Sequence, residues 1–316
     1  MKNTILYLKN KNFFFKRTLQ ILGRLIYPDH FPANSVRVKL YRKLGFNNTR
    51  TLLRNITWKA YHIYCRSGYS KTAKKDDMLH SAFLNNGYYV FPPSSSSSQV
   101  LNSLPEGFCE TLLDKAKLGV EGVDDDFFNI TKLHHFDQNE FQIIKTLLDD
   151  ETINAIRSIF DANFLVLSAY TSRSIPPLEK RELKSSWLWH ADNHPDCMIK
   201  VFFYLNDTDS LNAALQIHPR SSSREIFNLG FIDRNDVSPS LKLKLDDDNR
   251  YMNLEGKRGT RIFFDDNNIH RAVIAKERCR DVVVFEIIPS RNSDIQYMEL
   301  HSKYWKNPFT SSIPLV

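Results

Sequence analysis

The chain has 316 residues, of which 42% are hydrophobic and 12% aromatic, enough for one large domain with a buried core or for a domain plus an appendage. It contains only 10 glycines and has neither a GxGxxG nor a GxxxxGK[ST] pattern, which argues against a glycine-rich phosphate-binding fold. The net charge of +7 is unevenly distributed: residues 1–75 contain ten Lys and seven Arg against Asp29, a charge of +16, which leaves −9 for residues 76–316.

The basic segment predicts a mainly helical N-terminal region, residues 1–78, before a second domain at 79–316. Within it, Phe15, Leu19, Leu22 and Ile26 recur at helical spacing and form one apolar stripe. A basic amphipathic helix of this kind either packs on the domain or binds an anionic partner such as a membrane surface. The sequences RVKLYRKLGF and TLLRNITWKAYHIYCR also indicate helices, with interleaved aromatic residues.

Localisation follows from what the chain lacks. Charges interrupt every apolar run near the start, so no secretory signal is indicated. No stretch of about 20 apolar residues could span a bilayer. The cysteines Cys65, Cys109, Cys197 and Cys279 have no CxxC spacing, which argues against a zinc ribbon or a disulfide scaffold and suits a reducing compartment. We expect a cytoplasmic protein, either free or peripheral at a membrane.

The second domain reads as mainly β with flanking helices. NNGYYVF predicts a first strand, PPSSSSS a flexible loop, and LPEGFCETLLDKAKLG and DDETINAIRSIFDAN predict helices. From Phe164 onward, short strands alternate with turns: FLVLSAY, SSWLWHAD, MIKVFFYL, AALQIH, TRIFF, RAVIA and DVVVFEII. LKLKLDDDNRYMNLEG, between them, is interpreted as a polar insert over the mouth of the fold. This pattern predicts a sandwich or barrel, and with the residues below a double-stranded β-helix, the cupin-like jelly roll.

Three residues in this β-rich part form a candidate metal site. His190 and Asp192, in SSWLWHAD, are two positions apart and would share one face of a strand. His270 comes from a distant segment, after the strand RIFF. Two imidazoles and one carboxylate can occupy one face of an octahedral ion, which is the facial triad of non-haem Fe(II) oxygenases. Arg280 opens a further strand and offers a planar fork to a carboxylate.

The motifs HAD, IHR and RDVVVFEI, with the opening NNGYYVF, resemble the phytanoyl-CoA dioxygenase-like family of Fe(II)- and 2-oxoglutarate-dependent oxygenases. The resemblance covers roughly residues 85–289. It implies that His190, Asp192 and His270 hold Fe(II), that Arg280 binds the distal carboxylate of 2-oxoglutarate, and that O2 is consumed. One motif departs from the family: IHPRSSSRE keeps Pro219 and Ser221 but lacks the usual Gly and His of a Pro-Gly-Ser-His turn.

Several neighbouring residues have more than one reading. His194 would share the face of His190 and Asp192, but Pro195 favours a turn there and a pocket or loop role. Asp265 and Asp266 would orient a ligand imidazole or simply form the turn DDNN. Strand positions make Tyr170 and Lys200 plausible pocket residues, although Lys200 is more typical of a solvated or paired strand edge. His218 is read as a loop histidine, and Asn193 as a substrate contact or a turn residue.

The predicted function is an Fe(II)/2-oxoglutarate-dependent dioxygenase that hydroxylates an unactivated C–H of a small-molecule, lipid or lipid-linked sugar substrate. One alternative is an oxidative demethylase of nucleic acid, suggested by the basic N-terminal region. By family analogy such enzymes carry a second Arg inside the last strand, whereas Arg278 and Arg280 both precede it. The other alternative is a non-catalytic jelly roll that binds an anionic partner, which the intact triad disfavours.

Overall fold

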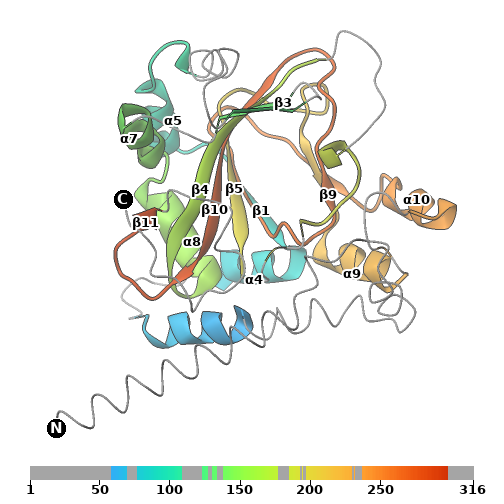
Figure 1. Cartoon of the computed structure of the whole chain (residues 1–316), viewed down its shortest axis with the longest axis horizontal. Helices are drawn as coiled ribbons and strands as arrows, with labels where there is room; N and C mark the ends of the chain where they lie inside the picture. The colour runs from blue at the N-terminus through green and yellow to red at the C-terminus, as the bar shows by residue number, and fades with distance from the viewer. Residues whose placement is uncertain are drawn as a thin grey trace.

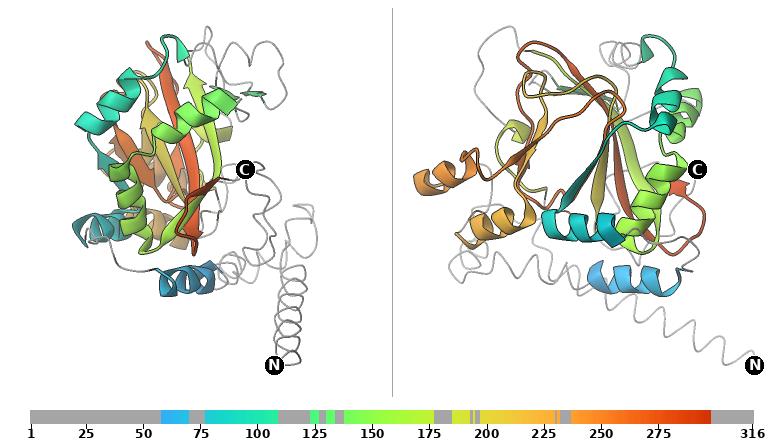
Figure 2. Two further views of the ribbon diagram at one scale, coloured as in Figure 1. Left: turned by 90° about the vertical axis from the view of Figure 1, so that its left-hand side faces the viewer. Right: turned by 180° about the vertical axis from the view of Figure 1, so that it is seen from behind.

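The computed structural model of the chain describes residues 58–69, 77–108, 123–126, 130–133, 138–176, 185–192, 194, 197–229, 231 and 237–297. Two mostly antiparallel sheets of unequal size face each other, and helices cover the outside of the larger sheet (Figures 1 and 2). This arrangement confirms the predicted jelly roll, mainly β with flanking helices.

The larger sheet holds eight strands. Its order is β1 (Tyr88–Phe91), β8 (Arg261–Phe264), β5 (Ile199–Tyr204), β10 (Arg280–Ser290), β4 (Asn163–Ser174), β3 (Ile130–Leu133) and β2 (Val123–Asp126), and β11 (Gln296–Tyr297) pairs in parallel with β4. The smaller sheet has the order β7 (Met252–Leu254), β6 (Leu215–Ile217) and β9 (His270–Arg271). An isolated bridge between His190 and His270 extends the smaller sheet by one residue. The candidate site therefore draws residues from both sheets: His190 and His270 lie at the edge of the smaller sheet, and Arg280 lies in β10 of the larger one.

Strand β5 shows how the larger sheet forms two cores. All six of its residues are buried, and alternate side chains point to opposite faces. Ile199, Val201 and Phe203 join the outer core under the helices. Phe202 and Tyr204 point inward and pack with Leu215, Ile217 and Leu254 of the smaller sheet. The inner face of this central strand therefore lines the space between the two sheets.

Four helices close the outer core. They are α4 (Asp77–Asn86), α5 (Ser95–Asn102), α7 (Gln138–Thr146) and α8 (Asp150–Phe160), and each contributes buried apolar side chains. Helix α8 confirms the sequence prediction, and it begins where the Asp149 carboxylate accepts a hydrogen bond from the backbone of Thr152 at 2.8 Å. Helices α9 (Arg220–Asn228) and α10 (Pro239–Leu245) lie beside the smaller sheet (Figure 1).

Four predicted elements were wrong, wholly or in part. The serine run is not a loop, because Ser94 and Ser97 form a reciprocal capping box that starts helix α5. The supposed polar insert supplies helix α10 and strand β7, so it belongs to the fold. SSWLWHAD forms a 3-10 turn, η1 (Ser185–Trp187), and one β-bridge in place of a strand. RAVIA is predicted as a strand, but only its first residue, Arg271, belongs to the two-residue strand β9, which pairs with the short strand β6.

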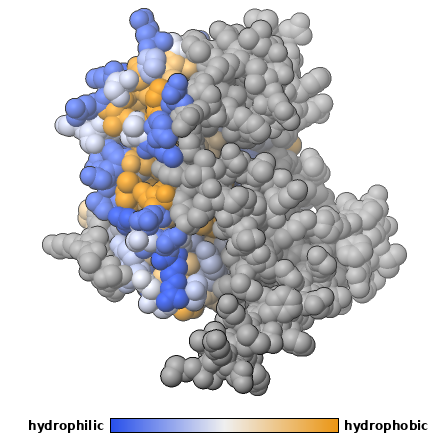
Figure 3. Space-filling view, turned by 60° about the vertical axis from the view of Figure 1, so that its left-hand side comes forward, coloured by the Kyte–Doolittle hydropathy of each residue, from blue (hydrophilic) through white to orange (hydrophobic). Residues whose placement is uncertain are grey.

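The basic N-terminal region lies largely outside the described residues, including the predicted amphipathic helix from Phe15 to Ile26. Residues 58–67 are helical, in agreement with prediction, and bury Trp58 and Cys65. The domain boundary near residue 78 stays a prediction. Within the described part of the chain, every helix is too short or too polar to cross a membrane. On the face shown in Figure 3, described apolar residues form patches between hydrophilic ones.

Candidate metal centre

The β-bridge between His190 and His270, at the edge of the smaller sheet, brings the predicted ligands together. His190 and His270 exchange both backbone hydrogen bonds, at 3.0 and 2.8 Å, which places their imidazoles side by side with ring centroids 4.4 Å apart. Asp192 follows in the loop, and its backbone N–H donates to the carbonyl of Asp266 at 3.0 Å. One ligand atom from each of the three residues lies within 4.8 Å of the others. The three residues thus lie together, although the His-x-Asp segment is a bridge and a loop in place of a strand. Their role as metal ligands stays a prediction.

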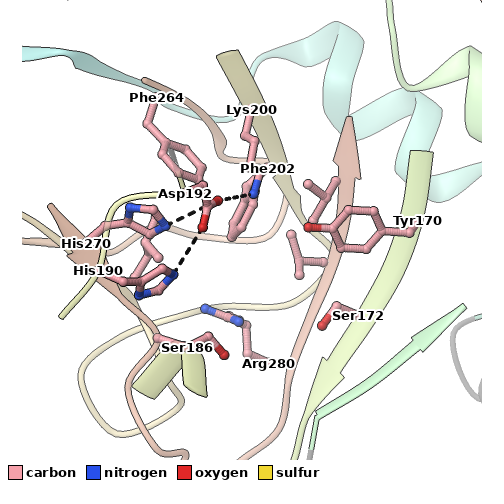
Figure 4. Close-up of a pocket in the computed structure, with 14 residues that line it drawn as sticks. Tyr170, Ser172, Ser186, His190, Asp192, Lys200, Phe202, Phe264, His270 and Arg280 are labelled. Atoms are coloured by element: carbon pink, nitrogen blue, oxygen red, sulfur yellow. Dashed lines mark hydrogen bonds and ion pairs between the residues drawn. The ribbon is translucent and has the colours of Figure 1, made fainter. Parts of the chain in front are cut away.

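Both histidines are fixed in the orientation that a metal needs. Nδ1 of His190 lies 2.8 Å from the carbonyl of Leu188, and Nδ1 of His270 lies 2.8 Å from the carbonyl of Asn268. Because a carbonyl oxygen only accepts, each Nδ1 carries the hydrogen and each Nε2 presents its lone pair. Nε2 of His190 lies 3.3 Å from Oδ1 of Asp192, and Nε2 of His270 lies 3.8 Å from Oδ2 (Figure 4). The three donor atoms therefore converge.

The charge state of the triad also suits a cation. Burial, with the nearby His190 ring, lowers the pKa of His270 to about 3, so this imidazole stays neutral near pH 7. Burial alone would raise the pKa of Asp192, but the Lys200 ammonium and the hydrogen bond with His190 hold that pKa well below its usual range. A neutral His270 imidazole and an ionised Asp192 carboxylate are donors of the kind found in a facial triad, which leaves open positions for further ligands.

The triad lies at one part of a cavity of about 120 Å³. Tyr170, Phe202 and Phe264 form much of its wall, and Ser172, Ser186 and Arg280 lie away from Asp192 (Figure 4). The predicted pocket position of Tyr170 is thus confirmed. An apolar wall with a few polar groups is typical of a small-molecule site.

Arg280 is a buried cation whose side chain is incompletely satisfied. It occupies the first position of β10, opposite Ser174 of β4. Nη1 donates to the carbonyl of Ala213 at 2.7 Å and Nη2 to Oγ of Ser174 at 3.3 Å, whereas the buried Nε has no hydrogen-bond partner among the described residues. Burial lowers the pKa of Arg280 from its ordinary value. Since a buried guanidinium is normally paired with an anion, this residue fits a carboxylate ligand that enters the cavity.

Other predicted residues lie elsewhere or act differently. Nδ1 of His194 pairs with Oδ2 of Asp266, so Asp266 does not orient a ligand imidazole; the carbonyls of Leu188 and Asn268 do. Asp265 pairs instead with Arg220 at 2.8 Å.

His218 lies outside the cavity, buried among Ser222 and the carbonyls of Leu245 and Arg250. Arg278, the neighbour of Arg280, forms an exposed ion pair with Asp209 at 2.8 Å. Asn193 falls outside the described residues.

Lys200 lies elsewhere than its sequence pattern favours. It lines the cavity and lies 2.5 Å from Asp192, whereas the pattern favours a solvated or paired position at a strand edge. Strand β5 lies between β8 and β10, so it is not an edge strand, and its two faces are buried because helices cover one and the smaller sheet covers the other. Glu286, opposite Lys200 on β10, is a further charged residue that the motifs do not single out. A charged residue amid an apolar strand was the available signal, because such a residue needs a buried partner.

Comparisons with known proteins agree with this fold. No family profile and no curated protein matches the sequence. Among solved structures, EctD from S. alaskensis in its apoform has a TM-score of 0.53 at 17% identity, over 70% of this chain and 79% of EctD. EctD with 2-oxoglutarate and 5-hydroxyectoine has a TM-score of 0.51 at 15% identity, over 76% of this chain and 86% of EctD.

A second solved protein of this kind is SnoK, a non-heme alpha-ketoglutarate dependent carbocyclase from nogalamycin biosynthesis. It has a TM-score of 0.50 at 17% identity, over 71% of this chain and 86% of SnoK. The chain therefore has the jelly-roll fold found in these oxygenases. Membership of the phytanoyl-CoA dioxygenase-like family stays a prediction.

Proposed function

We propose that this protein is an Fe(II)- and 2-oxoglutarate-dependent dioxygenase of the phytanoyl-CoA dioxygenase-like type, which hydroxylates an unactivated C–H. One observation carries the proposal: two imidazole Nε2 atoms and the Asp192 carboxylate converge in a cavity that also contains Arg280, a buried and incompletely paired guanidinium. A metal triad and a carboxylate anchor in one cavity are the two elements that this chemistry requires from the protein.

The residues of the chain have distinct tasks in this proposal. His190, Asp192 and His270 would hold the iron, which when bound together with 2-oxoglutarate would activate O2 as the oxidant, 2-oxoglutarate being oxidised to succinate and CO2. Arg280 would bind the distal carboxylate of 2-oxoglutarate with its planar fork and so fix the orientation of that molecule. The carbonyls of Leu188 and Asn268 keep both imidazoles in the ligating tautomer. Phe202 and Phe264 help to exclude water from the cavity.

The test is turnover of 2-oxoglutarate that depends on iron and O2. Full-length protein is incubated with Fe(II), ascorbate and 2-oxoglutarate, and succinate is measured with and without a cell extract. We expect succinate only when iron and O2 are both present, and mass spectrometry of the extract should reveal a product that gains one oxygen atom. Asp192→Ala should abolish both signals. Succinate formation by Asp192→Ala at the wild-type rate would refute the proposal.

We also propose that the basic segment of residues 1–75 docks the enzyme on an anionic membrane surface, with a lipid or lipid-linked sugar as substrate. Its charge of +16 supports this, since each Lys or Arg near such a surface contributes about 1 kcal/mol. Full-length protein should sediment with anionic but not zwitterionic vesicles, and less so as salt increases. A chain that begins near Asp76 should remain in the supernatant. Full-length protein that ignores anionic vesicles at low salt would contradict this proposal.

A further inference from the structure

Lys200 is the one ammonium in a buried group of three carboxylates. Its Nζ lies 2.5 Å from Oδ2 of Asp192, 3.6 Å from Oδ2 of Asp266 and 3.5 Å from Oε1 of Glu286. The Asp266 side chain is fully buried, the Glu286 side chain is 4% exposed, and the Lys200 side chain is 11% exposed. Figure 4 shows Lys200 directed at Asp192 from the side opposite to Arg280. Such a group is stable only when cations compensate its charge.

Two possible cation positions meet at Asp192. The first is the triad of His190, Asp192 and His270; the second combines Asp192 with His194 and Asp266, again with ligand atoms within 4.8 Å of one another. The Asp192 carboxylate faces both positions. Its Oδ1 lies 3.3 Å from Nε2 of His190, and its Oδ2 lies 3.8 Å from Nε2 of His270 and 2.5 Å from Nζ of Lys200. In the second position Oδ1 of Asp266 is buried and has no hydrogen-bond partner among the described residues. A carboxylate shared in this way is typical of sites with two metal ions about 3.5–4 Å apart.

The ammonium of Lys200 stands where a second ion would be held. It is in contact with Asp192 and within 4 Å of Asp266, the two carboxylates of the second set. The sheet register fixes it there: Lys200 on β5 lies opposite Glu286 on β10, and Glu286 accepts a hydrogen bond from Ser168 of β4 at 2.8 Å. Three carboxylates face one ammonium here, together with the His194 imidazole that pairs with Asp266. The group therefore keeps an excess of negative charge that a divalent ion can offset.

We propose that the Lys200 ammonium occupies the second of the two cation positions that share Asp192. The site then holds one divalent ion, and Asp192 remains a ligand of that ion. This inference rests on the proposed metal centre. Lys200 is a positioning residue: its ammonium contacts the Asp192 carboxylate and affects the metal ion only through that carboxylate. Without the ammonium, the carboxylates of Asp192 and Asp266 lose the cation that lies between them and become free to bind a second ion.

The number of bound ions tests the proposal. Full-length protein and variants are dialysed anaerobically against Mn(II), and metal per chain is measured by elemental analysis. We expect one ion in the wild type, two in Lys200→Met, and one again in the double variant Lys200→Met/Asp266→Asn. Electron paramagnetic resonance should detect a magnetically coupled Mn(II) pair only in Lys200→Met. Lys244→Met, which removes a half-exposed surface ammonium, should bind one ion.

The outcomes separate this inference from the proposed function. A wild type that binds no ion, or binds one that survives His190→Ala, would refute the metal centre itself. A wild type with one ion and a folded Lys200→Met that also binds only one would refute the role of Lys200 alone.

A measurement on the unaltered protein covers the case in which Lys200→Met does not fold. If the ammonium keeps its position, Lys200 should resist acetylation equally with and without Mn(II). Labelling that appears on addition of Mn(II) would mean that the ion displaces Lys200, and it would overturn the proposal.

Discussion

Both faces of the central strand β5 are buried, but the side chains on the two faces differ in chemistry. On β5 the outward side chains, Ile199, Val201 and Phe203, pack under helices in a continuous apolar core. The inward side chains begin with Lys200 and continue with Phe202 and Tyr204 between the two sheets. On β10 the same contrast separates Phe285 from Glu286. On these strands the outer side chains stabilise the fold by apolar packing, whereas the inner side chains include buried charges. Lys200 is paired with Asp192, while Arg280 is incompletely paired.

The largest expected effect lies on the inner side, at the metal triad. His190→Ala or His270→Ala should abolish Fe(II) binding, because two remaining ligands do not hold the ion. Anaerobic Fe(II) with 2-oxoglutarate should give a weak visible charge-transfer band in the wild type and none in these variants. His194→Ala is the matched control and should keep the band, because His194 belongs to the second ligand set. If only His194→Ala lost the band, the metal ligands would instead be Asp192, His194 and Asp266.

On the outer side, Phe285→Ala should lower the free energy of unfolding by about 3–5 kcal/mol, since it leaves a cavity in a close-packed core. Phe285 is fully buried and packs near Phe203, with ring centroids 6.4 Å apart. Urea denaturation measures the change, and the folded variant should still bind one metal ion. Phe285→Leu should cost much less. A cost below about 1 kcal/mol for the alanine variant would mean that the outer face is not the stabilising one.

Arg280→Ala should affect 2-oxoglutarate and leave iron bound. Loss of a buried charged partner costs about 2–5 kcal/mol, so the apparent requirement for 2-oxoglutarate should increase by at least roughly 30-fold. Arg280→Lys, which keeps the charge but not the planar fork, should recover only part of that loss. Arg278→Ala should leave the requirement unchanged, because Arg278 is engaged with Asp209 on the surface. The reverse pattern would reassign the anchor to Arg278.

The same contrast explains what could be predicted from sequence. The triad and Arg280 were identifiable because their residue types and spacing follow from metal and carboxylate chemistry. The strands β4, β5 and β10 were identifiable because long apolar runs encode them. Lys200 was misjudged because local alternation cannot distinguish a solvated face from a polar interior; only the order β8-β5-β10 places this strand at the centre. The backbone hydrogen bond from Asp192 to Asp266 could not be predicted either, because it joins segments that are far apart in the sequence.

The smallest expected effect on stability concerns the helices outside the sheet. There the serine run forms helix α5, and Leu101 of this helix is buried in the outer core. Ser94 caps this helix: its Oγ accepts a hydrogen bond from the backbone of Ser97 at 3.0 Å, and Oγ of Ser97 accepts one from the backbone of Ser94 at 2.8 Å. Ser94→Ala should therefore lower the free energy of unfolding by about 1 kcal/mol, and Ser94→Gly by only a few tenths. Ser95→Ala, an exposed substitution one position later, should have almost no effect. Equal costs for Ser94→Ala and Ser95→Ala would show that packing of Leu101, and not the cap, determines where this helix begins.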